Sequence, residues 1–203
     1  LGDVYKRQAM EGSIFIAGAG VQWLRDRMKF FKKAPETEKI VKSLKDNNNI
    51  YLVPAFTGLG APYWDANARG VLSGITRDTS PKEIVRATIE AVAYQTYDLF
   101  EAMKHDGLRP KIVKVDGGMV MNNWFSQFLS DIVNVKVLRP KVQETTALGA
   151  AFMAGLNIGV YKSLKDISKN WQLDKKFSSK MKNSSRNILI DGWEKAVKRA
   201  LIN

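Results

Sequence analysis

The sequence predicts an α/β domain in which helices flank a mixed sheet. The main observation is an alternation of strand and helix patterns from residue 70 to residue 156, which is typical of parallel β-α-β units. A hydrophobic fraction of 45%, with 15 Gly and only 6 Pro, is the composition of a globular protein. At about 100–200 residues per domain, 203 residues suit one domain or two small ones.

Two strands and two helices are predicted before residue 57. Residues 11–16, EGSIFI, read as a short strand that runs into a Gly-Ala-Gly turn, and a helix follows over residues 20–31. Residues 32–49 are charged and predict a surface helix flanked by loops. Residues 50–56, IYLVPAF, are apolar enough for a strand, but their proline places it at a sheet edge or ends it.

The segment from residue 57 to residue 70, TGLGAPYWDANARG, is irregular and rich in Gly and aromatic residues. It is too specific to be a mere linker. Asp65 within it is interpreted as a hydrogen-bond acceptor that braces the loop. A short strand follows over residues 71–75.

The clearest helix begins at Ser80. Ser80-Pro81-Lys82-Glu83 is a capping box, with Pro at the first helical position, and apolar residues at helical spacing follow it to about Lys104. Gly107 and Pro110 then end the helix. Further elements follow it: a strand at 111–115, a helix at 122–133, a strand at 135–138, a helix at 145–156 and a last helix at about 184–202.

Small residues dominate the predicted helix at 145–156, which favours close packing of this helix on a sheet. In the last helix, Trp193, Val197 and Leu201 recur every four residues and predict a buried stripe.

The composition excludes several kinds of chemistry. With no Cys, the chain has no disulfides, zinc fingers, iron–sulfur clusters or thiol catalysis, and the single His, His105, argues against a Ser-His-Asp hydrolase or a histidine-rich metal site. The carboxylates are scattered, and none forms an obvious pair for acid–base catalysis. Asp116, at a strand end beside two glycines, is the one that stands in a suggestive place.

No membrane span and no nucleic-acid site are predicted. The uncharged run at residues 145–161 is 17 residues long, short of the ~20 apolar residues that a spanning helix needs. Without cysteine or an export signal, a cytoplasmic location is expected. The net charge is +12, and residues 161–203 hold 11 Lys and Arg against 4 Asp and Glu. Because these are interspersed with apolar residues and no nucleic-acid motif is present, a solvated lysine-rich surface is favoured.

Two glycine-containing turns are candidate ligand sites. Residues 115–123, VDGGMVMNN, follow a strand, where Gly117 and Gly118 would let a phosphate or base approach and Asn122 could read an adenine edge or ribose. A plain tight turn explains that motif equally well. The turn at Gly18 lacks the third glycine of a dinucleotide fingerprint, so on the turn alone a helix start is favoured.

Taken together, these segments resemble the carboxy-terminal domain of the FGGY carbohydrate kinases, which belong to the actin-like, ribonuclease-H-like ATPases. The most specific stretch is VPAFTGLGAPYWDANARG at 53–70, which points to members that phosphorylate glycerol rather than a pentulose. Residues 70–95 are similar to the second family signature, and residues 115–123 and 144–155 fit the same family.

The resemblance implies transfer of the ATP γ-phosphoryl group to glycerol, with ATP and Mg²⁺ as cofactors. It implies that Gly18 and Gln22 contact the nucleotide and that Gly118 and Asn122 cradle its phosphate and adenosine portions. The catalytic base, the metal ligands and most glycerol contacts would belong to an amino-terminal domain, so no catalytic or metal-binding residue is assigned here. A homo-oligomer is expected for the full-length protein.

The chain begins without Met, and residues 1–8 carry no clear pattern, so we expect a junction segment followed by the kinase domain at 9–203. As a fragment without the first strands of the family's sheet, the chain is expected to be inactive alone, and its strand at 11–16 would be an aggregation-prone edge. The alternatives are a non-catalytic nucleotide-binding or scaffold module of the same fold and, resting on charge alone, a nucleic-acid-binding protein.

Overall fold

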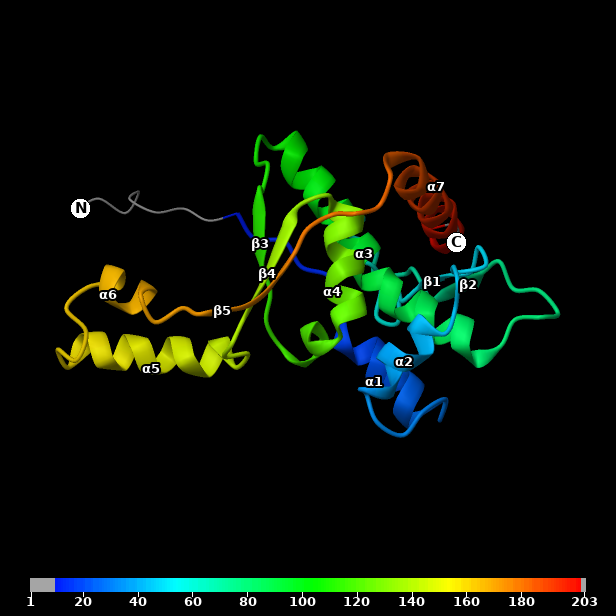
Figure 1. Ribbon diagram of the computed structural model, residues 1–203. Helices are drawn as coiled ribbons and strands as arrows, with labels where there is room; N and C mark the ends of the chain where they lie inside the picture. Colours follow the sequence, from blue (N-terminus) through cyan, green and yellow to red (C-terminus); the bar gives the residue numbers. More distant parts are fainter. Residues whose placement is uncertain (1–9, 202–203) are drawn as a thin grey trace.

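The computed structural model describes residues 10–201 (Figure 1). The predicted junction segment, residues 1–8, therefore lies outside the described part. In chain order the elements are α1 (Gly18–Asp26), α2 (Glu36–Lys42), β1 (Tyr51–Val53), β2 (Val71–Ser73), α3 (Pro81–His105), β3 (Ile112–Lys114), the 3-10 helix η1 (Gly118–Met121), α4 (Asn123–Val133), β4 (Lys136–Pro140), α5 (Thr145–Asn157), α6 (Leu164–Ser168), β5 (Leu173–Phe177) and α7 (Asn183–Ala200).

The strands form two small sheets. β1 and β2 pair antiparallel, with Tyr51 opposite Ser73. β3, β4 and β5 form a mixed sheet in that order, because β3 runs parallel and β5 antiparallel to β4. The β3–α4–β4 segment is thus a parallel β-α-β unit, as predicted. The β2–α3–β3 segment is not one, since β2 and β3 belong to different sheets.

Helix α3 lies in the middle of the molecule, between α4 and the β1–β2 sheet (Figure 1). The predicted capping box is present: the Ser80 hydroxyl accepts from the Lys82 N–H at 3.2 Å, and the Glu83 carboxylate accepts from the Ser80 N–H at 2.9 Å. Beyond this cap every residue from 85 to 95 is buried. A helix that is buried on all sides must pack against neighbours in several directions, so α3 organises the fold.

An aromatic cluster fixes the neighbours of α3. Tyr94 stacks on Trp193 of α7 at 5.3 Å between ring centroids and meets Phe128 of α4 edge-on at 5.7 Å. Tyr51 of β1 lies 5.9 Å from the same ring. Each such pair adds about 0.5–1.5 kcal/mol beyond the buried area. The predicted buried stripe of the last helix is confirmed, since Trp193 and Val197 are buried and Leu201 packs against them.

A buried carboxylate ties the irregular segment 57–70 to the core. One oxygen of Asp98 accepts from the Tyr63 hydroxyl at 2.9 Å and from the Trp193 Nε1–H at 2.7 Å. As predicted, Asp65 braces the segment, because it accepts from the N–H groups of Asn67 and Ala68. The segment is therefore a fixed part of the fold.

The first predicted strand is absent. Residues 11–16 have no strand assignment, because no described segment forms a hydrogen-bonded ladder with them. The predicted helix at 20–31 ends at Asp26, and Lys29 lies in the left-handed region at φ 59°, which no helix can accommodate. The surface helix within 32–49 is confined to α2. Neither α6 nor β5 was predicted.

Helix α5 is present, but its predicted packing on a sheet is wrong for the described chain. Only Gly155 in it is buried, and α5 extends away from the body beside α6 (Figure 1). Its contacts are local instead: Phe152 meets Tyr161 edge-on at 5.6 Å, and a Cβ at Gly155 would lie 2.8 Å from the Tyr161 ring. The small residue at 155 thus serves a contact with the chain that follows α5.

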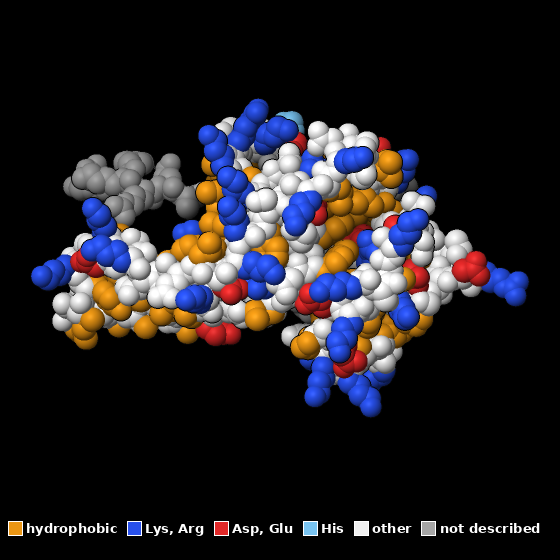
Figure 2. Space-filling view, in the orientation of Figure 1, with side chains coloured by type: hydrophobic (Ala, Val, Ile, Leu, Met, Phe, Trp, Pro, Cys, Tyr) orange, Lys and Arg blue, Asp and Glu red, His pale blue; other side chains and the backbone are white. Residues whose placement is uncertain are grey.

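Charged side chains are spread over the whole visible face (Figure 2). Lys and Arg occur from α6 across the mixed sheet to α7, with hydrophobic and uncharged groups between them. Among residues 10–201 no helix is long and apolar enough to cross a membrane.

Asp98 should make the stability depend on pH. Burial raises the pKa of Asp98 to about 6, outweighing the hydrogen bonds from Trp193 and Tyr63 that favour the charged form. Because the pKa is higher in the folded than in the unfolded chain, protonation of Asp98 favours folding below its ordinary pKa of 3.8, and this contribution is lost as the pH rises through about 6.

The uncharged variant Asp98→Asn keeps an oxygen acceptor for both donors. At neutral pH we expect its free energy of unfolding to be at least that of the parent and up to about 3 kcal/mol higher. The dependence of this free energy on pH should also be weaker than in the parent. Urea unfolding across this pH range measures both, and Asp191→Asn, an exposed change on α7, is the control. A variant that is clearly less stable than the parent at neutral pH would contradict the interpretation.

Candidate functional site

A cavity of about 330 Å³ opens between α1, α2, α3 and η1. All four residues named from the resemblance, Gly18, Gln22, Gly118 and Asn122, line it. The other lining residues are Val21, Arg25, Ala34, Pro35, Thr37, Glu38, Ile89, Met119 and Met121. Two turns almost 100 residues apart in the chain therefore meet at one place.

The two glycines of the first turn have different roles. A Cβ at Gly20 would lie 3.0 Å from the Thr88 methyl group, so Gly20 allows α1 to approach α3 closely. A Cβ at Gly18 would have no atom within 4 Å, and Gly18 is the first residue of α1 on the cavity wall. The packing interpretation thus holds for Gly20, while Gly18 leaves the start of the helix open to a ligand. Gln22, one turn further on, is exposed.

The second turn follows β3 and also uses its glycines differently. Gly117 has φ 83°, a conformation that other residues rarely adopt, and its N–H donates to the Gln143 carbonyl at 3.3 Å. Gly118 begins η1, has no atom within 4 Å of an added Cβ and lines the cavity. Gly117 therefore makes the turn, and Gly118 leaves the cavity wall accessible.

Asn122 joins the second turn to two helices. Its Oδ1 accepts from the Phe125 N–H at 3.0 Å and thereby caps α4. Its Nδ2 donates to the Thr37 hydroxyl of α2 at 3.4 Å. Asn122 is thus held in place by the fold itself.

The charges at the cavity are paired. Arg25 makes two hydrogen bonds to Asp26, at 2.7 and 2.8 Å, and Glu38 pairs with Lys42 at 2.5 Å. Burial alone would raise the pKa of Glu38, but the hydrogen bonds from Lys42 and Asn123 outweigh burial and lower it. The remaining walls are mostly apolar. An apolar cavity with a few placed polar groups is the usual form of a small-molecule site.

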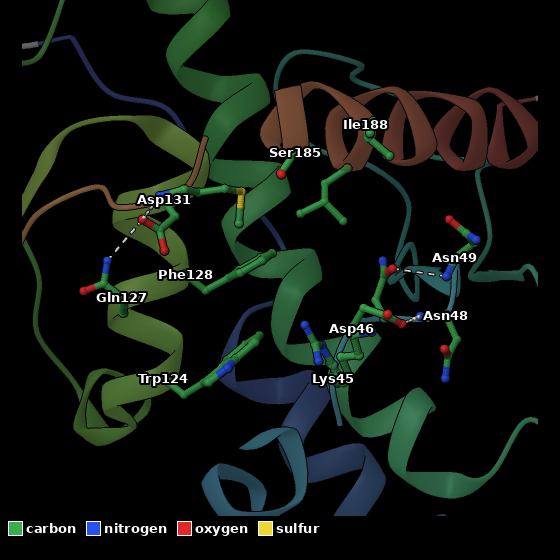
Figure 3. A pocket seen from close by; sticks show the side chains of 14 residues that line it. Lys45, Asp46, Asn48, Asn49, Trp124, Gln127, Phe128, Asp131, Ser185 and Ile188 are labelled. Atoms are coloured by element: carbon green, nitrogen blue, oxygen red, sulfur yellow. Dashed lines mark hydrogen bonds between the residues drawn. The ribbon is translucent and has the colours of Figure 1, made fainter. Parts of the chain in front are cut away.

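A larger cavity, of about 710 Å³, lies between the loop at 45–49, α4 and α7 (Figure 3). Two of its acidic side chains serve the fold. Asp131 accepts from Gln127 and from the Lys180 and Met181 N–H groups, and Asp46 accepts from the Asn48 N–H. None of the four residues implied by the resemblance lines it. The smaller cavity is therefore the better candidate.

Other residues singled out from the sequence lie outside the cavity. The Thr145 hydroxyl donates to Asp116, which connects the end of β3 to the start of α5. His105 is the exposed last residue of α3. Within residues 10–201 no three carboxylates or histidines are placed to hold a metal ion together.

The α2 side of the cavity was missed by sequence analysis, which treated residues 32–49 as surface. Thr37 and Val41 are buried on one side of this otherwise charged helix. Their spacing of four residues was the available signal.

Comparison with known proteins identifies the class. The profile of the FGGY family of carbohydrate kinases, C-terminal domain, matches residues 2–158. The chain belongs to this family, as the resemblance indicated.

Particular relatives are glycerol kinases. The chain is 56% identical over 191 residues to glycerol kinase 1 of Pseudomonas aeruginosa, covering 94% of the chain and 39% of the relative. It is 52% identical over 194 residues to the glycerol kinase of Clostridium botulinum, covering 95% and 39% respectively. The chain thus spans about 39% of the length of these relatives.

Solved structures confirm the predicted fold class. The glycerol kinase of Plasmodium falciparum, solved with ADP, superposes with a TM-score of 0.83 at 37% identity, over 94% of this chain and 38% of that one. A xylulose kinase from Lactobacillus acidophilus superposes with a TM-score of 0.75 at 24% identity, over 93% and 38%, which shows the shared fold.

The neighbouring glycines of the second turn allow a matched test. We expect Gly117→Ala to lower the free energy of unfolding by about 1–2 kcal/mol, because alanine is strained at a positive φ. Gly118→Ala should change it by less than about 0.5 kcal/mol, because its Cβ would meet no atom. Urea unfolding of both variants measures this, and equal losses would show that Gly118 also has a conformational role.

Proposed function

We propose that this chain forms the nucleotide-binding part of a glycerol kinase, which transfers the γ-phosphoryl group of ATP to glycerol and yields sn-glycerol 3-phosphate and ADP. The observation that carries the proposal is the meeting of Gly18, Gln22, Gly118 and Asn122 in one cavity. The identity of 50–56% to several glycerol kinases and the ADP in the Plasmodium structure support it.

The cavity offers separate groups to the parts of a nucleotide. Gly18 and Gly118 leave the backbone open to phosphate oxygens, and the start of α1 supplies N–H groups with a favourable dipole. The apolar walls at Ile89, Met119 and Met121 suit a base. Gln22 and Asn122 add carboxamides that can bind its polar edges or the ribose.

Catalysis needs more than these residues. Phosphoryl transfer depends on positioning and on neutralising the developing charge. Glu38 is the only carboxylate that lines the cavity, and Lys42 already engages it. We therefore propose that the 203 residues alone do not phosphorylate glycerol. The base, the Mg²⁺ ligands and most glycerol contacts would come from an amino-terminal domain, in a cytoplasmic and homo-oligomeric enzyme.

A fusion tests this function. Residues 9–203 are joined to the amino-terminal portion of the Pseudomonas relative that precedes its aligned segment, and glycerol-dependent ADP formation is measured. We expect the fusion to be active and the isolated chain to be inactive. A fusion that folds and binds ADP but does not phosphorylate glycerol would contradict the proposal and favour a non-catalytic nucleotide-binding module.

Gln22 tests nucleotide binding more directly. Its exposed carboxamide has no assigned role in the fold, so Gln22→Ala should leave the stability unchanged. Loss of one hydrogen bond of about 1 kcal/mol should raise the Kd for ADP about fivefold. Isothermal titration calorimetry measures this, with the exposed Gln172→Ala as control. An unchanged Kd would remove Gln22 from the site.

A further inference from the structure

Three residues on one wall of the candidate cavity are connected by a short chain of hydrogen bonds. The Thr37 hydroxyl donates to the Ala34 carbonyl at 2.7 Å and accepts from the Asn122 Nδ2 at 3.4 Å. Ala34, Thr37 and Asn122 all line the cavity. Thr37 is only 4% exposed, so water competes little for these bonds.

This chain of hydrogen bonds gives the Asn122 carboxamide a single orientation. A hydroxyl has one proton, and that of Thr37 goes to Ala34, so Thr37 can only accept from Asn122. On the other side, the Phe125 N–H can only donate, so it faces the Oδ1 of Asn122. A flipped carboxamide would place two donors together at Phe125 and two acceptors together at Thr37.

Among residues 10–201, each end of this carboxamide makes one hydrogen bond to a neighbour and can form one more. Nδ2 has two protons and donates one of them to Thr37. Oδ1 has two lone pairs and uses one of them to accept the Phe125 N–H. Asn122 can therefore present one donor and one acceptor, in a fixed order, to a ligand in the cavity.

That pattern distinguishes the two kinds of purine. Adenine offers an amino donor at position 6 beside the N7 acceptor, which an oriented Asn side chain matches with two hydrogen bonds. Guanine offers two acceptors at the same edge, so its oxygen would face the Asn122 oxygen. A good bidentate pair contributes about 1–3 kcal/mol of discrimination, which is roughly 5-fold to 150-fold in affinity.

We propose that Thr37 is a positioning residue that makes this cavity select a 6-amino purine nucleotide over a 6-oxo one, by fixing the orientation of Asn122. The inference rests on the proposed nucleotide-binding function. Thr37 does not need to touch the ligand, because it acts through Asn122.

The test compares the Kd values for ADP and GDP by titration calorimetry in the 203-residue chain and two variants. The parent should bind ADP at least about fivefold more tightly than GDP. Thr37→Val has nearly the same shape but no hydroxyl, and the Phe125 N–H still contacts Asn122 in it. The ADP preference should therefore fall measurably but not vanish, mainly through weaker ADP binding. Thr37→Ser keeps the hydroxyl and should retain the preference. Thermal melts show whether each variant is folded.

The outcomes separate the two proposals. If the parent binds neither nucleotide, the proposed function fails and this inference fails with it. If the parent binds ADP but shows no preference, or if Thr37→Val keeps the full preference, only the role of Thr37 is overturned. Should Thr37→Val not fold, the ratio of the Kd values for GDP and ADP is measured in Thr37→Ala, which also lacks the hydroxyl.

Discussion

The burial of helix α3 is the constraint on which the rest of the structure depends. Its residues from 85 to 95 are all buried, so α1, α2, α4 and β1 must fit against it. Within this helix Glu90 is fully buried and pairs with Arg86 at 2.7 Å, and Arg86 also donates to the Leu44 carbonyl at 2.9 Å. An unpaired charge there would be very costly, so this pair fixes both the helix and the loop before β1.

Helix α3 determines the geometry of the candidate site. Gly20 lets α1 lie directly against Thr88, which places Gly18 and Gln22 at the cavity. Ile89, one residue further along α3, forms part of the cavity wall itself. On the next side, the Tyr94–Phe128 contact holds α4, whose cap is Asn122. Both glycine turns are thus positioned by residues within two turns of one helix.

Local sequence signals predicted the structure correctly where they agreed with the packing. The capping box and the apolar spacing after Ser80 gave α3 almost to the residue, and Pro54 marked the end of β1. These signals predicted wrongly where contact with a distant segment decides the structure. Residues 11–16 are apolar but have no ladder partner among the described residues. Helix α5 is exposed despite its apolar composition. Local patterns carry no information about such partners.

The site shows the same division between local and long-range information. A Gly-Ala-Gly turn and an Asp-Gly-Gly turn are weak signals alone, and spacing could not tell a ligand site from a tight turn. The structure separates the roles within each pair: Gly20 and Gly117 are required by packing and by φ, whereas Gly18 and Gly118 face open space. Of these four glycines, the two without a conformational or packing reason are the two that the family resemblance assigns to the nucleotide. This agreement between the packing of the turns and the family resemblance supports the proposed site.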